Sequence, residues 1–187
     1  MRRAKLGDVY CIEVPNGYKL FQWAYKIPKR GEFMRVFDGL YKTIPNDIEA
    51  IVKSQHSYII AFYIQRAYRI GLAQFLGNYA VPEEYPFPKY QINFSVDSNH
   101  KLDAVHVMNS DGKFGVSKWH EVGSMDELPE PYRDVTLLSS YLTPNWLLYL
   151  FDKGFDLKHP ERYFPGQDIE EKLKPYDEII SRYWKGK

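Results

Sequence analysis

Cysteine is almost absent from this chain of 187 residues, which contains only Cys11. One thiol cannot form an intramolecular disulfide, and it cannot supply the several thiolates of a cysteine-based metal cluster. Cys11 lies within an alternating apolar pattern, where a lone cysteine usually acts as a small buried hydrophobe. We therefore expect Cys11 to be a core residue and not a reactive thiol.

Long hydrophobic runs are absent as well. The longest run, from Tyr58 to Ile64, has the length of a strand, whereas a transmembrane helix needs about 20 apolar residues. The basic residues Arg2, Arg3 and Lys5 are not followed by an apolar segment of the signal-peptide type. We expect a cytoplasmic protein that has no membrane partner.

The short motifs of common catalytic sites are also missing. There is no Gly-x-Ser-x-Gly elbow around a nucleophilic serine. There is no glycine-rich loop that could hold a phosphate, because Gly71 and Gly77 are spaced like strand ends. We therefore expect a non-enzymatic protein with no catalytic residue, no metal and no cofactor.

A clear β-hairpin signal opens the chain, over residues 5–18. Apolar residues occupy both alternating positions of the first strand, so both of its faces are expected to be covered. Asn16 and Gly17 supply the positive φ angles that a two-residue hairpin turn needs. The opening therefore indicates a strand that lies inside a sheet.

The remaining pattern predicts one α+β domain over residues 1–187, mainly strand in 8–120 and mainly helix in 143–184. We expect a strongly bent, mainly antiparallel sheet with a barrel-like N-terminal meander. The C-terminal helices are expected to pack on this sheet, because their apolar residues recur at helical spacing.

Individual elements follow from turn and cap signals. Asn46 or Asp47 is expected to cap a helix at 48–53, and Pro175 is expected to kink or split the last helix. The expected strands are 18–27, 32–37, 57–65, 90–96, 103–108 and 113–119, and the expected helices are 48–53, 144–154 and 168–183, with a short connection at 66–70 and a proline-bearing loop at 81–89.

The net charge of +1 hides an uneven distribution of charge. Residues 1–70 carry a net charge of +6, whereas residues 71–187 carry −5. The acidic half contains a segment in which only Arg133 opposes the acids, and such a segment can steer a basic protein partner. We predict that this segment binds the partner through Glu121, Asp126, Glu127, Glu130 and Asp134.

A metal-assisted hydrolase remains an alternative. It would use His106, His120 and Asp103, with His100 close by in the sequence, because imidazole and carboxylate groups are common ligands of catalytic metals. The two histidines must share one face of their strands, which a shift of one residue in register decides. No His-Glu-x-x-His pattern accompanies them.

A module that binds single-stranded nucleic acid is the second alternative. Basic residues interleaved with aromatic ones on a small sheet are typical of such proteins. The chain as a whole is nearly neutral, which dilutes the basic patch, so nucleic acid is not the expected partner. The residues concerned are Arg2, Arg3, Lys5, Lys26, Lys29, Arg30, Arg66 and Arg69, with Tyr25, Phe33, Tyr63 and Tyr68.

The chain resembles the immunity protein 26 family of bacterial proteins. The resemblance covers residues 5–165, although Ala73 stands where the family tends to have tryptophan. It implies a cytoplasmic protein that binds and neutralises a polymorphic toxin domain, and it carries no catalytic residues over. The 16 tyrosines fit such a binding role, because tyrosine is enriched in protein interfaces. The motifs are Lys5-x-Gly7-Asp8-Val9-Tyr10-x-Ile12, then Pro15-Asn16-Gly17-Tyr18, and the stretch from Gly71 to Gly77 before the loop at Pro82.

Overall fold

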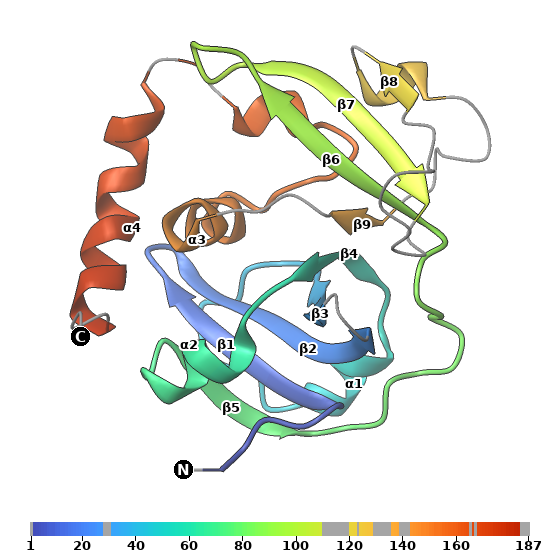
Figure 1. Ribbon diagram of the computed structural model, residues 1–187. Helices are drawn as coiled ribbons and strands as arrows, with labels where there is room; N and C mark the ends of the chain where they lie inside the picture. Colours follow the sequence, from blue (N-terminus) through green and yellow to red (C-terminus); the bar gives the residue numbers. More distant parts are fainter. Residues whose placement is uncertain are drawn as a thin grey trace.

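The computed structural model describes residues 2–27, 31–109, 120–122, 124–128, 136–138, 143–164, 166 and 168–183. These residues form an α+β fold with a mixed sheet and four α-helices (Figure 1). The strands are β1 (Asp8–Val14), β2 (Gly17–Ile27), β3 (Gly31–Phe37), β4 (His56–Ala61), β5 (Ala73–Asn78), β6 (Tyr90–Val96), β7 (Leu102–Asn109), β8 (His120–Val122) and β9 (Leu137–Leu138). The helices are α1 (Ile48–Lys53), α2 (Ile64–Arg69), α3 (Pro144–Asp152) and α4 (Ile169–Tyr183), with short 3-10 helices η1 (Met125–Glu127) and η2 (Pro160–Tyr163).

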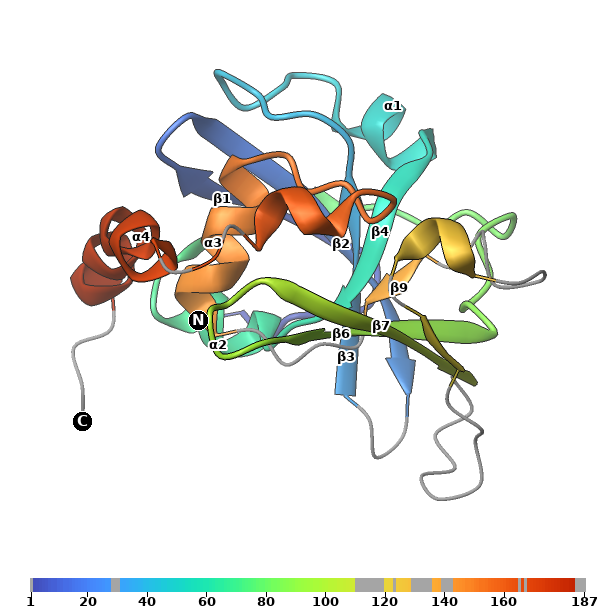
Figure 2. The same cartoon turned by 90° about the horizontal axis from the view of Figure 1, so that it is seen from above.

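The sheet runs in the order β5-β1-β2-β3-β4-β9-β6-β7-β8. Its pairings are antiparallel except at β9, which pairs in parallel with both β4 and β6. The ends at β5 and β8 do not meet, so the sheet is open and the expected barrel-like meander is not confirmed. Seen from above, β6 and β7 run across the direction of β3 and β4 (Figure 2). The expectation of a mainly antiparallel sheet is confirmed.

The predicted opening hairpin forms as β1 and β2, but Val14 pairs with Gly17, so the two turn residues are Pro15 and Asn16 and not Asn16 and Gly17. Of the two expected positive φ angles, only that of Gly17, at +150°, is found. Both faces of β1 are buried, as its sequence indicates. Tyr10 and Ile12 belong to the main core, whereas Val9 and Cys11 belong to a second core that α1 covers. Cys11 is 1% exposed, and burial raises the pKa of its thiol to about 11, which fits a core residue.

The main core lies between the inner face of β1 to β4 and the helices α2, α3 and α4. In Figure 1, α3 lies between the β1–β2 hairpin and the β6–β7 hairpin. The Asp152 carboxylate, at the end of α3, accepts hydrogen bonds of 2.8 Å from the backbone N–H and the side-chain amide of Asn16. It also accepts one of 2.8 Å from the Tyr176 hydroxyl of α4. One buried carboxylate thus connects the hairpin turn to both C-terminal helices.

The helices follow the sequence signals in part. Asp47 caps α1 through a hydrogen bond from the Ala50 N–H, as predicted. The strand expected to reach Gln65 ends at Ala61, because the next residues form α2 and bury Ile64 and Ala67 on one side. The last helix runs through Pro175 unbroken, so the predicted split does not occur. In the described part of the chain, no helix is long and apolar enough to cross a membrane.

Close backbone contacts at glycines in the opening motif generate a first prediction. Gly7 has φ +88°, and a Cβ atom there would lie 2.6 Å from the Tyr79 carbonyl oxygen. Gly154 has a similar positive φ of +65° but open space around it. We expect Gly7→Ala to lower the free energy of unfolding by about 3 kcal/mol and Gly154→Ala by about 1 kcal/mol. Urea unfolding measures both, and equal losses would show that the contact with Tyr79 has no energetic role.

Candidate functional site

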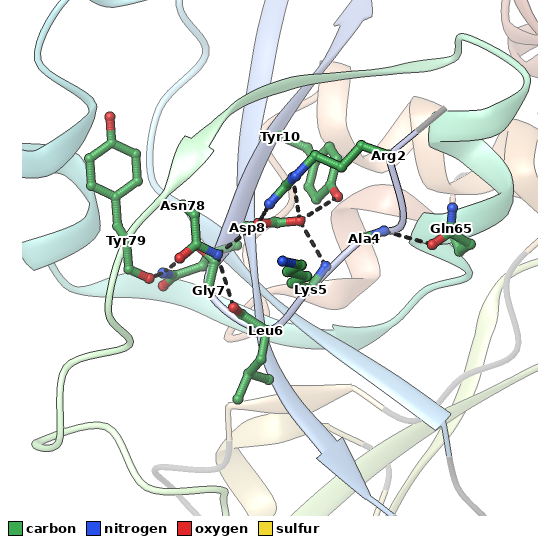
Figure 3. Close-up of polar contacts among 11 residues, drawn as sticks. Arg2, Ala4, Lys5, Leu6, Gly7, Asp8, Tyr10, Gln65, Asn78 and Tyr79 are labelled. Carbon is green, nitrogen blue, oxygen red and sulfur yellow. Dashed lines mark hydrogen bonds and ion pairs between the residues drawn. The ribbon is translucent and has the colours of Figure 1, made fainter.

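The first candidate is the buried carboxylate of Asp8, which belongs to the opening motif (Figure 3). Arg2 donates two hydrogen bonds to its oxygens, of 2.8 and 2.7 Å. The Lys5 N–H donates at 2.8 Å, the Tyr10 hydroxyl at 3.0 Å and the Asn78 amide at 2.7 Å. Burial alone would raise the pKa of Asp8, but hydrogen bonds from Arg2, Asn78, Lys5 and Tyr10 outweigh it and lower the pKa.

This arrangement holds the amino-terminal arm, residues 2–6, against the sheet. Figure 3 shows the arm meeting α2, where the Ala4 N–H donates to the Gln65 side-chain oxygen at 2.7 Å. Both Asp8 oxygens are fully used by these internal partners. The carboxylate therefore acts as a structural anchor and has no oxygen left for a substrate.

The arm contacts generate a second prediction. Arg2→Ala removes two charge-assisted hydrogen bonds from a buried carboxylate, so we expect a clearly lower free energy of unfolding. Hydrogen exchange at the amides of residues 3–6 should accelerate in the same variant. The neighbouring Arg3 is exposed, so Arg3→Ala should change stability by less than about 0.5 kcal/mol. Equal effects of the two variants would contradict the anchor.

The second candidate is Arg35, a charged residue that is 0% exposed in the middle of the sheet. Its Nε donates to His56 Nδ1 at 3.3 Å, and its Nη1 donates to Gln22 Oε1 at 3.1 Å. The Val52 carbonyl accepts from Nη1 at 3.3 Å, and the Ser54 carbonyl accepts from Nη2 at 3.1 Å. We call these five residues the Arg35 centre.

No carboxylate among the described residues is hydrogen-bonded to Arg35. Its charge is instead balanced by carbonyls at the C-terminal end of α1, which is the negative end of the helix dipole. Burial lowers the pKa of Arg35. Burial, reinforced by the Arg35 charge, also lowers the pKa of His56 to about 4. His56 is therefore neutral at pH 7 and can accept the hydrogen bond from Arg35.

The loop after β5 covers this centre. The guanidinium carbon of Arg35 lies 4.4 Å from the centre of the Tyr85 ring, which also packs edge-on against His56. The Tyr85 carbonyl accepts a hydrogen bond of 2.6 Å from the Tyr25 hydroxyl, and Phe87 packs against Tyr25. The centre thus ties α1, the sheet and this loop together. The sequence signal for the Arg35 centre is a polar residue, Gln22 or Arg35, at a buried strand position. The predictions from the sequence do not include this centre.

The neutral His56 generates a third prediction. Because its folded pKa of about 4 lies below the ordinary value of about 6.5, the unfolded chain binds more protons between these pH values. The stabilisation is present above pH 6.5 and falls as the pH drops toward 4, by about 2 kcal/mol. His56→Asn keeps an acceptor for Arg35 but cannot titrate. Urea unfolding at pH 7 and pH 4.5 should give a smaller acid loss for this variant than for the native chain, and equal losses would contradict the assignment.

The histidines of the metal alternative are not brought together. The β7–β8 register places His106 opposite Glu121, and His120 opposite Val107. The His106 Nε2 instead lies 2.7 Å from the Ser95 hydroxyl. Among the described residues, no three His, Cys, Asp or Glu side chains are grouped so as to hold a metal ion.

The predicted acidic partner site lies at the β8 end of the sheet. Glu121 belongs to β8, and Asp126 and Glu127 belong to η1, where both are exposed. The Ser124 hydroxyl donates to the Glu127 carboxylate at 3.3 Å. Glu130 and Asp134 lie outside the described residues. The assignment of this segment to a partner stays a prediction.

The fold places the basic and aromatic residues of the nucleic-acid alternative in different environments. Arg2 is engaged with Asp8, and Phe33 is 2% exposed in the core. Tyr25 and Tyr68 are half-buried, with the Tyr68 ring against Tyr10. Tyr63 alone of the four aromatic residues is exposed.

Comparison of the chain with family models, with curated proteins and with solved structures finds no significant match. The resemblance to the immunity protein family therefore rests on the motif residues themselves.

Proposed function

We propose that this chain is a non-enzymatic, cytoplasmic immunity-type protein of the immunity protein 26 family, which binds and neutralises a toxin domain. In this proposal the protein blocks its partner by covering the partner's working surface. Shape and charge complementarity are then the whole mechanism, and no bond is made or broken.

The observation that carries the proposal is the role of the motif residues. Gly7 approaches the Tyr79 carbonyl, Asp8 anchors the arm and Asn16 binds Asp152. Each residue is used to hold the opening hairpin in place. A resemblance based on such residues is a resemblance between scaffolds, so the contact with the partner is proposed from the exposed acids instead.

The exposed acids Asp126 and Glu127 supply the proposed contact with the toxin. Exposed charges at the rim of an interface raise the rate of association with a partner of opposite charge and make that rate depend on salt. The proposed toxin surface is therefore basic, and the complex should form more slowly as the salt concentration rises.

The fourth prediction tests this role. Tagged protein is used to capture partners from cells that carry the gene, and a retained toxin domain is then purified for surface plasmon resonance. We expect a 1:1 complex of sub-micromolar affinity, because a stable inhibitor must remain bound at cellular concentrations. Combined Asp126→Asn and Glu127→Gln substitutions should slow association several-fold at low salt, with little change at high salt.

The matched control is the pair Glu170→Gln and Glu171→Gln, which removes the same charge from the exposed side of α4. These substitutions should leave association unchanged. Capture without any toxic domain would refute the proposed function. If the combined Asp126→Asn and Glu127→Gln variant associates with the toxin as fast as the native chain does, the toxin contacts another surface of the chain.

A further inference from the structure

Tyr63 is the most exposed large hydrophobic residue among the described ones, with 78% of its surface accessible. It follows β4 and occupies the N-cap position of α2. Apolar rings of this size are usually at least half covered, because exposing them to water is unfavourable. The position therefore needs an explanation beyond packing.

Local helix chemistry does not supply that explanation. N-cap positions favour Ser, Thr, Asp and Asn, whose side chains accept a hydrogen bond from the first turn. Tyr63 makes no such hydrogen bond at the start of α2. Tyrosine at this position thus contributes neither core packing nor a helix cap.

Three exposed basic residues, Arg3, Lys26 and Arg66, belong to segments close to Tyr63. Arg66 lies in the first turn of α2, where its backbone N–H donates to the Tyr63 carbonyl. The Phe62 N–H donates to the Glu32 carbonyl, and Lys26 pairs with Glu32 across β2 and β3, so these residues meet at one end of the sheet. The arm reaches the same place through the hydrogen bond between Ala4 and Gln65. We call Tyr63, Arg3, Lys26, Glu32 and Arg66 the Tyr63 surface.

Glu32 is the acidic member of this surface. Burial raises its pKa, while Lys26, a backbone hydrogen bond from Gln65 and the charge of Arg3 act in the opposite direction. Arg3 and Lys26 therefore both lie within electrostatic reach of one carboxylate. With three cations and one acid, the surface has a net positive charge.

We propose that the Tyr63 surface binds single-stranded nucleic acid, with a base stacked on the Tyr63 ring and phosphates on Arg3, Lys26 and Arg66. Binding sites for single strands combine an exposed aromatic platform with cations that follow the backbone. A protein partner fits less well. The anchor residues of protein interfaces lie within apolar surroundings, whereas the other four members of the Tyr63 surface are all charged.

The test uses fluorescein-labelled dT12 and rU12 as probes, with the full chain in 20 mM salt and fluorescence anisotropy as the readout. We expect a Kd in the micromolar range that rises with salt. For three phosphate contacts, the slope of log K against log salt should be about −2. Lys26→Gln should reduce the magnitude of this slope by about 0.7.

Three substitutions at Tyr63 separate binding from folding. Tyr63→Ala should weaken binding roughly 10- to 100-fold, because base stacking is lost, and Tyr63→Phe should retain binding. Tyr63→Ser provides a helix cap, so it should raise the Tm by about 2–4 °C while it weakens binding as much as Tyr63→Ala. A more stable protein that binds less cannot be explained by unfolding.

Two further variants complete the design. Glu32→Gln removes the acid from the surface and should strengthen binding several-fold, a gain that a purely structural role does not produce. The control Tyr183→Ala removes a tyrosine of α4 that is 36% exposed, and it should leave binding unchanged.

Three results would overturn the proposal. These are no binding of either probe at 100 µM protein, binding that Tyr63→Ala leaves intact, and equally tight binding of poly-L-glutamate with the same dependence on Tyr63. The last result would identify an acidic polypeptide as the partner. None of these results bears on the capture of a toxin, so this proposal and the proposed function succeed or fail separately.

Discussion

The fold depends on a parallel pairing of two residues in the middle of the sheet. Leu137 and Leu138 of β9 lie between β4 and β6, and both are almost fully buried. Among the described strands, β9 is the connection between the group from β5 to β4 and the group from β6 to β8. The strands of the two groups run at a steep angle to each other (Figure 2). The buried face of α3 packs into the main core between them.

Buried charge in this protein holds elements together. Asp8 fixes the arm, Asp152 fixes the C-terminal helices to the opening hairpin, and Arg35 fixes α1 to the sheet. Each buried charge is matched by hydrogen-bond partners, which offset the cost of removing it from water. The acids of η1 and the basic members of the Tyr63 surface are exposed, and these are the groups that we propose for recognition.

Local signals in the sequence predicted the elements that local chemistry determines. The opening hairpin, the Asp47 cap and the start of α3 at Pro144 all depend on neighbouring residues, and all three are found. The hairpin turn lies one residue earlier than predicted, at Pro15 and Asn16. The two-residue strand β9 has no local signature, because its pairing partners are remote in sequence. Helix α2 was missed for a different reason, because the apolar residues at its start also fit a strand. The partners of Arg35 come from three separate segments, which a single sequence does not bring together.

We propose that this chain acts by covering a toxin. The most direct measurement is a titration of a captured toxin domain with the purified chain, in which residual toxin activity is followed in the same samples as complex formation. The account predicts that activity falls in proportion to the complex and reaches zero at one chain per toxin. Full activity of the toxin in a saturated complex would contradict it.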